Sequence, residues 1–265
     1  MSAGRQRIIT GLTAAVIAVA STFLMPPWMF VLLMMALFFV AAREFADLGR
    51  HIAPTAPMMA LPWLAIATGG GLWVLLGQAA TSVDLGAFLV MAFTAVMLIA
   101  AGINLFSRAT MRDAMSGVGL YAFGVPYVGL AIAALAHLQR RDPWLLILLC
   151  AIVWLGDTVA YYVGSKIGRR RLAPQVSPKK SWEGAIASFV AALLVTLVWS
   201  GLRHGAWYAP GLLLVAAVTA VMAQIGDLVE SIFKRGAATS SRPGAYHAPW
   251  RRPLHTRVTS SAATK

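Results

Sequence analysis

Long apolar stretches separated by short polar segments constrain this chain more than any other feature. A helix needs about 20 mainly apolar residues to cross a bilayer. Eight stretches approach or exceed that length: residues 8–25, 28–42, 57–79, 85–106, 117–138, 143–164, 182–202 and 208–233. The second is short for a full crossing, and Pro26-Pro27 before it predicts a tight hairpin with the first. The pattern predicts an all-α, polytopic membrane helix bundle with about eight transmembrane helices.

The composition excludes several other classes of protein. Apolar residues make up 59% of the chain and charged residues only 12%, whereas a soluble domain carries about 25% charge. An ordinary soluble enzyme, a disordered protein and a nucleic-acid-binding domain are therefore excluded, and no nucleic-acid partner is expected. The single cysteine, Cys150, lies in an apolar run, so the chain has no internal disulfide framework.

The distribution of basic residues predicts the orientation in the membrane. We place the N-terminus in the cytoplasm and let eight spans alternate. All but three of the 22 Lys and Arg residues then fall on the cytoplasmic side, the exceptions being Arg140, Arg141 and Arg203. Cytoplasmic loops carry an excess of Lys and Arg, and this also explains the net charge of +13. Both termini are expected to be cytoplasmic.

Five of the nine acidic residues have a simple structural interpretation. Glu44 and Asp47 follow the second stretch, beside Arg43 and Arg50, and are expected to form a juxtamembrane cluster of ion pairs. The other three lie in loops near helix ends and are expected to be solvated: Asp84, Asp113 and Asp142.

The remaining four acidic residues predict a functional site. Asp157 lies within the sixth stretch, and Glu183 opens the seventh. Asp227 and Glu230 lie in the last turns of the eighth, at i and i+3, on one helix face. Carboxylates in membrane helices are costly and usually functional. In the alternating topology all four lie at one depth, near the cytoplasmic surface.

Basic residues accompany these carboxylates. The loop after the sixth stretch ends in Ser-Pro-Lys-Lys-Ser-Trp-Glu-Gly, residues 177–184. Ser181 is placed to cap the seventh helix, whose positive end would attract phosphate oxygens. Carboxylates that hold Mg²⁺, beside cations that hold phosphates, indicate phosphoryl or nucleotidyl transfer. Two basic pairs could hold those phosphates: Lys179 with Lys180, and Lys234 with Arg235.

These segments resemble the phosphatidate cytidylyltransferases, also called CDP-diacylglycerol synthases. The matching blocks come in the family's order and spacing within residues 156–235, while the N-terminal stretches match only in being apolar. The blocks are Gly156-Asp157 with Ala160-Tyr161 and Gly164, Gly168 with residues 177–184, and Gly226-Asp227-Leu228-Val229-Glu230-Ser231-Ile232-Phe233-Lys234-Arg235.

The resemblance implies an enzyme, a nucleotidyltransferase of phospholipid biosynthesis. Its expected substrates are CTP and phosphatidic acid, from which it would form CDP-diacylglycerol and pyrophosphate. The expected cofactor is Mg²⁺ or Mn²⁺, with a second cation as a further expectation. Membrane lipids and a second copy of the chain, as a homodimer, are the expected partners. The expected location is the bacterial inner membrane, with the active site on the cytoplasmic side.

The resemblance also assigns roles to residues by position. Asp227 would be the leading metal ligand, with Glu230 on the metal or directly behind its ligands. Asp157 and Glu183 would orient ligands or a second cation. The residues implied to bind the triphosphate and the lipid phosphate are Ser177, Lys179, Lys180, Ser181, Ser231, Lys234 and Arg235.

The expected organisation is a membrane domain over residues 1–235, with N-terminal spans over 8–138 and a catalytic half over 143–235. A basic tail, 236–265, is expected to be disordered. Beyond residue 235 the family pattern would continue with a Lys-Asp pair, Pro-Gly-His-Gly-Gly, Asp-Arg-x-Asp and a final span. This chain has no acidic residue after Glu230, so the family's further metal-binding aspartates are missing.

The sequence of the tail suggests a cause. Residues 249–253, Pro-Trp-Arg-Arg-Pro, can be encoded so that reading one base later gives His-Gly-Gly-Val, part of the missing motif. We hypothesise that the tail is frameshifted. A chain with this tail is expected to bind metal poorly and to have weak or no activity.

Three alternatives stay open. One is a catalytically impaired member of the same family. Another is a different CTP-dependent lipid kinase or transferase, such as a polyprenol kinase, although residues 177–184 argue against it. The third is a transporter, which would place its charges near the bilayer midplane, whereas the acidic residues here lie toward one face.

Overall fold

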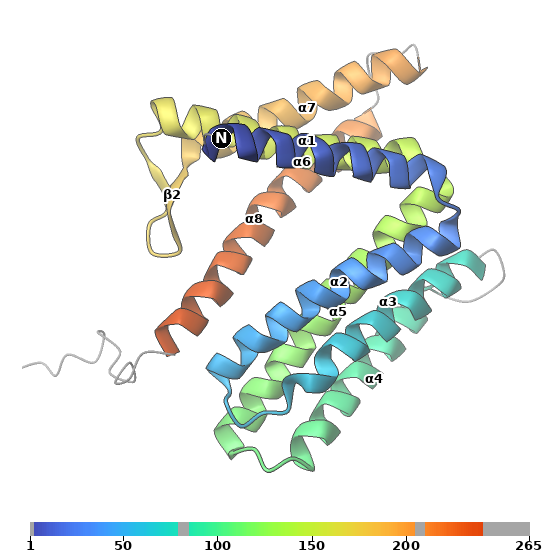
Figure 1. The fold of residues 1–265 in the computed structure, drawn as a ribbon, viewed down its shortest axis with the longest axis vertical. Coiled ribbons are helices and arrows are strands. Elements are labelled where there is room, and N and C mark those ends of the chain that lie inside the picture. The colour runs from blue at the N-terminus through green and yellow to red at the C-terminus, as the bar shows by residue number, and fades with distance from the viewer. Residues whose placement is uncertain (1–2, 79–84, 205–209, 241–265) are drawn as a thin grey trace, which may run out of the picture.

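The computed structural model describes residues 3–78, 85–204 and 210–240, which form eight α-helices and one two-stranded hairpin (Figure 1). The helices are α1 (Ala3–Leu24), α2 (Pro27–Ile52), α3 (Leu61–Gln78), α4 (Leu85–Leu105), α5 (Met111–Arg141), α6 (Pro143–Ile167), α7 (Trp182–His204) and α8 (Pro210–Ser240). A short 3₁₀ turn, η1 (Met58–Ala60), precedes α3. The helical bundle expected from the apolar stretches is confirmed.

Six helices are long and apolar enough to cross a membrane: α2, α3 with η1, α5, α6, α7 and α8. In the described part of the chain, α1 and α4 contribute shorter apolar segments, Thr13–Leu24 and Leu89–Leu105. The chain is therefore an all-α polytopic membrane protein. Eight spans and two cytoplasmic termini stay predictions.

The second helix is longer than its apolar run. α2 begins at Pro27, where the missing N–H costs nothing. It ends at Ile52 because the next residue, Ala53, precedes Pro54 and takes an extended φ of −131°. The run of 28–42 was predicted to end before the charged residues, but these belong to the same helix and continue it by almost three turns.

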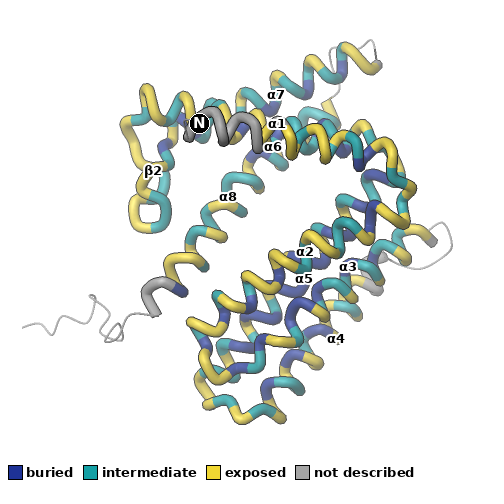
Figure 2. The backbone as a smooth tube through the Cα atoms, viewed as in Figure 1, coloured by how far each residue is buried: buried dark blue, intermediate teal, exposed yellow. Residues whose placement is uncertain are grey.

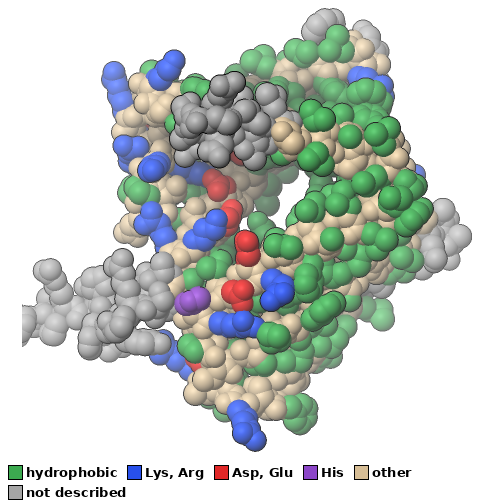
Figure 3. Space-filling view, viewed as in Figure 1, with side chains coloured by type: hydrophobic (Ala, Val, Ile, Leu, Met, Phe, Trp, Pro, Cys, Tyr) green, Lys and Arg blue, Asp and Glu red, His purple; other side chains and the backbone are tan. Residues whose placement is uncertain are grey.

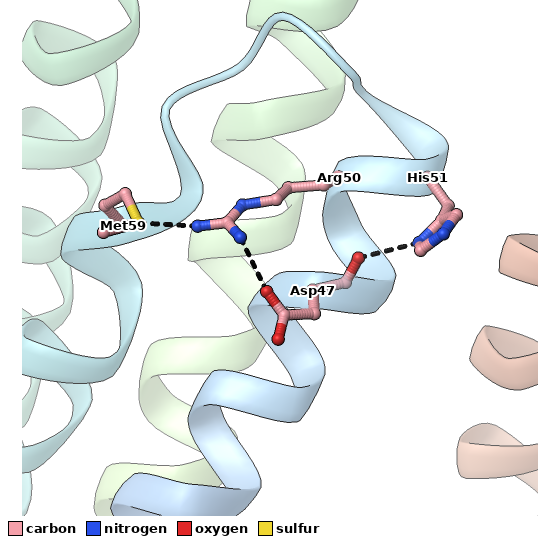
Figure 4. A network of polar contacts seen from close by, with 4 residues as sticks. All are labelled: Asp47, Arg50, His51 and Met59. Atoms are coloured by element: carbon pink, nitrogen blue, oxygen red, sulfur yellow. Dashed lines mark hydrogen bonds and ion pairs between the residues drawn. The ribbon is translucent and has the colours of Figure 1, made fainter.

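The expected ion pair at the end of α2 is confirmed for two residues. The Arg50 guanidinium lies 2.7 Å from the Asp47 carboxylate, and it also contacts the Met59 sulfur at 2.6 Å (Figure 4). His51 Nδ1 lies 2.9 Å from the Asp47 carbonyl oxygen. The contact with Met59 fastens the end of α2 to η1.

The predicted loop acids have specific partners. Asp113 accepts hydrogen bonds from the Thr55 backbone N–H at 3.0 Å and from its hydroxyl at 2.6 Å. Asp142 caps α6 by accepting from Trp144 N–H at 2.9 Å. Asp84 lies outside the described residues. The two described carboxylates therefore hold helix ends and connections in place.

The N-terminal half packs around α5. Its buried side chains meet α2, α3 and α4, and the dark blue residues of Figure 2 concentrate along these helices. Tyr121 is fully buried, and its hydroxyl donates to the Pro57 carbonyl at 2.5 Å. The helices α2, α3, α4 and α5 thus form one packed unit, which α6 and α8 contact.

The C-terminal half is built on close contact between α6 and α7. Gly184 of α7 approaches α6 so closely that an added Cβ would lie 2.7 Å from the Ala160 carbonyl oxygen. Gly156 of α6 is equally close to α7: a Cβ added at Gly156 would lie 2.8 Å from the Ser188 hydroxyl oxygen. Small residues four apart allow such approach in membrane helices.

The eighth helix joins the two halves. α8 packs against α6 and α7 near its start and against α2 farther along, as Figure 1 shows. Phe233 of α8 contacts Phe45 of α2 and Phe123 of α5, with ring centroids 5.0 Å and 5.1 Å apart. α8 continues to Ser240, past the boundary expected at residue 235, and residues 241–265 of the predicted tail lie outside the described part.

The basic loop between α6 and α7 is a hairpin, which the sequence did not predict. β1 (Arg171–Ala173) pairs antiparallel with β2 (Ser177–Ser181), with Arg171 opposite Ser181. The fold class stays all-α, and this short hairpin is an element that the prediction did not include. Backbone pairing across the hairpin gives the basic residues fixed positions.

Candidate functional site

A pocket of about 550 Å³ lies among α6, the hairpin, the start of α7 and the middle of α8. Its volume falls in the range of roughly 300–1,000 Å³ typical of small-molecule sites. Of the predicted site residues, the pocket brings together Asp157, Lys179, Lys180, Ser181 and Asp227. Three separate elements thus deliver carboxylates and ammonium groups to one cavity.

The hairpin and α7 hold the basic wall of the pocket. Ser181 Oγ accepts from Gly184 N–H at 3.2 Å, so the predicted cap of α7 is confirmed. Trp182 N–H donates to the Arg170 carbonyl at 2.9 Å, which joins the hairpin directly to the helix. Lys179 and Lys180, at the end of β2, are therefore presented beside the positive end of α7.

Glu183 fastens the hairpin and lies outside the residues that line the pocket. Its carboxylate accepts from Arg170 N–H, with 3.2 Å and 3.4 Å to its two oxygens. It also occupies the first turn of α7, where a negative charge is favourable. Through these contacts Glu183 positions the basic wall of the pocket.

The acidic wall comes from α6 and α8. Asp227 forms an ion pair with Lys180 across the pocket, with side-chain exposures of 54% and 23% respectively. Asp157 lines the same cavity from α6. The negative charges of Asp157 and Asp227 are balanced by three cations that line the same pocket: Lys179, Lys180 and Arg171.

The other predicted residues of α8 lie outside the pocket lining. Glu230 forms an ion pair with Lys234 one turn along the helix. Ser231 Oγ donates to the Asp227 carbonyl oxygen at 2.9 Å. Arg235 is exposed, and Ser177 stands at the far end of β2, half-buried. The structure thus separates a group in the pocket from a group farther along α8.

Figure 3 shows how these charges are distributed over the visible face. Lys and Arg side chains surround the hairpin end, and a row of acidic side chains lies beside them. Hydrophobic side chains cover much of the remaining described surface in this view. The charged strip contrasts with the apolar surface expected of helices in a bilayer.

Sequence reasoning missed four residues that line the pocket: Tyr161, Ser165, Arg171 and Gln224. Tyr161 and Ser165 follow Asp157 by one and two turns, and Gln224 precedes Asp227 by one turn, so helical spacing placed them on the right faces. No site role was assigned to them because three are uncharged and Arg171 belongs to a run of arginines; Tyr161 was named only within a block that resembles the family.

The donor set suits a divalent cation shared with phosphates. Mg²⁺ is usually held by one or two carboxylates together with substrate phosphates and water. Asp157 and Asp227 provide two such carboxylates in one cavity. Within residues 3–78, 85–204 and 210–240, no group of three or more His, Cys, Asp or Glu side chains forms a complete cage. The residues fit a cation whose coordination is completed by substrate phosphates and water.

Comparisons with known proteins agree with this chemistry. Residues 5–239 match the model of a family described as the cytidylyltransferase family. The chain is similar to a phosphatidate cytidylyltransferase of Brucella abortus, with 37% identity over 134 residues, 48% of each chain. It is similar to that of Haemophilus influenzae, with 33% identity over 126 residues, 44% of each. The protein of that name from Bacillus subtilis is 31% identical over 121 residues, 44% of this chain and 45% of the relative. The matched region spans about half the length of these relatives.

Proposed function

The chain belongs to the cytidylyltransferase family, and from this premise we propose that it transfers CMP from CTP to phosphatidic acid, giving CDP-diacylglycerol and pyrophosphate. One observation carries the proposal: two carboxylates and two ammonium groups line the same pocket, those of Asp157, Asp227, Lys179 and Lys180. Facing carboxylates and ammonium groups suit a reaction in which phosphates are gripped and one phosphorus is attacked.

The basic wall would bind the nucleotide. Lys179, Lys180 and Arg171 face the cavity, and cations of this kind neutralise phosphate oxygens. The positive end of α7 lies beside them and adds its partial charge. These groups would hold the triphosphate with its α-phosphorus accessible from the membrane side.

The acidic wall would hold the divalent cation. Asp157 and Asp227 would share Mg²⁺ or Mn²⁺ with triphosphate oxygens, and the bound cation would supply charge neutralisation for the departing pyrophosphate. Glu230, paired with Lys234 one turn beyond Asp227, would support the metal-binding end of α8, and Lys234 would meet the lipid phosphate. Ser177, Ser231 and Arg235 are proposed to act at this edge, and Glu183 to position the hairpin.

The reaction itself is a direct displacement. An oxygen of the lipid phosphate forms a bond to the α-phosphorus of CTP while the bond to the β-phosphate bridging oxygen breaks, so CMP is transferred and pyrophosphate leaves. The chain's residues would catalyse it by positioning the two phosphates in line and by neutralising charge. No covalent intermediate on the protein is needed.

The location of the pocket follows from the predicted orientation. With α6, α7 and α8 crossing the membrane and the basic hairpin in the cytoplasm, the pocket opens where a soluble nucleotide meets a lipid headgroup. We propose that the protein acts at the cytoplasmic face of the bacterial inner membrane, and that it pairs with a second copy as a homodimer.

A catalytically impaired family member is the second candidate. It is favoured by one observation: residues 231–265, where the family pattern would continue, contain no acidic residue. If the tail is frameshifted, resequencing the gene will show the His-Gly-Gly-Val motif in the alternate frame, and restoring that frame will raise activity. An intact frame with no such motif would remove the frameshift hypothesis.

Purified full-length protein, mixed with CTP, Mg²⁺ and phosphatidic acid in detergent micelles, provides the test. We expect CDP-diacylglycerol and pyrophosphate in equal amounts. Asp157→Asn and Asp227→Asn should each lower the rate about 100-fold or more, because catalytic charge stabilisation is lost. Asp47→Asn is the control, since Asp47 pairs with Arg50 outside the pocket. Unchanged rates in both pocket variants would refute the proposed site.

A further inference from the structure

One exposed aromatic ring faces the pocket without a role in the chemistry described above. Tyr161 of α6 lines the cavity and keeps 68% of its surface exposed. We infer that the ring of Tyr161 stacks on the pyrimidine base of the nucleotide and so is a substrate-binding residue. This inference rests on the proposed function and adds the subsite that receives the base.

The position of Tyr161 on α6 sets its ring beside the acidic wall. It follows Asp157 by one turn and precedes Ser165 by one turn, so the three share a helix face. All three line the same cavity. A base stacked on this ring would therefore lie about one helix turn, roughly 5.4 Å along the axis, from Asp157.

The neighbouring tyrosine behaves differently. Tyr162 is 57% exposed, yet it is not among the residues that line the pocket. The two rings meet edge to face, with centroids 5.5 Å apart and planes at 75°. Consecutive residues point about 100° apart around a helix, which explains why only one of them reaches the cavity.

The pocket lining offers two kinds of surface. Lys179, Lys180 and Arg171 form a cationic region for phosphates. Tyr161 and Ala185 offer aromatic and apolar surface, and Gln224 of α8 adds an amide that can donate to and accept from a base edge. Every nucleobase has a π-face, and stacking on an aromatic side chain is a general way to bind it.

A tyrosine near the end of a membrane helix can instead serve as an anchor at the membrane–water interface. That role needs an exposed ring, and both residues have one, with 57% of Tyr162 and 68% of Tyr161 exposed. Orientation into the cavity distinguishes the two residues. The pair thus provides a matched comparison within one helix turn.

The test measures binding of two probes to the purified full-length protein with Mg²⁺ and without lipid. The probes are CTP and inorganic tripolyphosphate, which lacks a base. Tyr161→Leu should weaken CTP binding roughly 10-fold to 100-fold, as expected for loss of one stacked base. Its tripolyphosphate binding should stay within about twofold of wild type. Tyr161→Phe should keep CTP binding, because the ring is retained, and Tyr162→Leu should leave both probes unchanged.

Three results would overturn the inference. If Tyr161→Leu binds CTP as the wild type does, no stacking occurs. If it loses CTP and tripolyphosphate together, the residue only supports the pocket. If the wild-type protein binds tripolyphosphate but not CTP, or neither, the proposed function fails and the base subsite with it. The first two results leave the proposed function standing.

Discussion

Lys180 of β2 forms an ion pair with Asp227 of α8, in the pocket that Asp157 also lines. The pair joins a residue that would bind phosphate to one that would bind the metal. In the ligand-free protein, the Lys180 ammonium group therefore lies where the cation would bind Asp227, and the Asp227 carboxylate lies where the phosphate would bind Lys180. Under the proposed function, loading the site would require Lys180 to exchange a carboxylate for a phosphate, and Asp227 to exchange an ammonium group for a cation.

Replacing Lys180 with Met tests this exchange. A half-exposed ion pair contributes about 0–1 kcal/mol, so Mn²⁺ binding without nucleotide should tighten by up to about fivefold. CTP binding should weaken, because a phosphate contact is lost. Electron paramagnetic resonance of Mn²⁺ measures the first effect directly. Lys179→Met is the matched control: Lys179 lines the pocket but has no ion pair among the described residues, so Mn²⁺ binding should not change. Weaker Mn²⁺ binding in Lys180→Met would contradict the exchange.

Glu230 and Asp227 should differ strongly in their effect on the rate. Glu230 pairs with Lys234 outside the pocket lining, whereas Asp227 faces the cavity. Glu230→Gln removes an exposed ion pair worth about 0–1 kcal/mol, and we expect less than a tenfold decrease in kcat/KM. The loss in Asp227→Asn should be at least ten times larger. Equal losses in the two variants would place Glu230 on the metal.

Glu183 should act on nucleotide binding through the hairpin. Glu183→Ala removes the acceptor of Arg170 N–H, and the loss of one charged hydrogen bond should raise KM for CTP roughly threefold to tenfold. The turnover number should change little. Hydrogen exchange at the hairpin should accelerate, and Glu183→Gln should restore part of the protection. A fall in kcat with normal exchange would instead indicate direct contact with the reacting groups.

Gly184 should be essential for packing of α6 on α7. A Cβ there would lie 2.7 Å from a backbone oxygen of α6, which cannot move aside cheaply. We expect Gly184→Ala to destabilise the protein by about 1–3 kcal/mol, seen as a lower midpoint of thermal unfolding in detergent. Gly119→Ala is the control, because an added Cβ at Gly119 in α5 meets nothing within 4 Å. Equal midpoints for the two variants would show that α6 and α7 can separate without cost.

Much of the fold could be predicted from apolar periodicity, since membrane helices have to satisfy their backbone hydrogen bonds internally. The helix order and the Ser181 cap followed from this and from capping chemistry. The extension of α2 to Ile52 did not, because its last turns are charged and lie beyond the apolar run. The hairpin was missed because its strands are short and rich in basic residues.

The site could be predicted only in part. Carboxylates in apolar runs and the lysines of residues 177–184 identified the right elements. Which of these side chains face the cavity depends on the rotation of each helix about its axis. That rotation is set by contacts such as Phe233 with Phe45, between residues far apart in the sequence. The spacing of Asp227 and Glu230 therefore could not reveal that only Asp227 lines the pocket.

The most direct test of the central claim follows the fate of labelled CTP. Membranes containing the chain are given phosphatidic acid with CTP labelled at either the α- or the γ-phosphorus. The account predicts that the α label enters the lipid as CDP-diacylglycerol and that the γ label leaves as pyrophosphate. Transfer of the γ label to lipid would reveal a kinase, and no labelled lipid from either substrate would contradict the account.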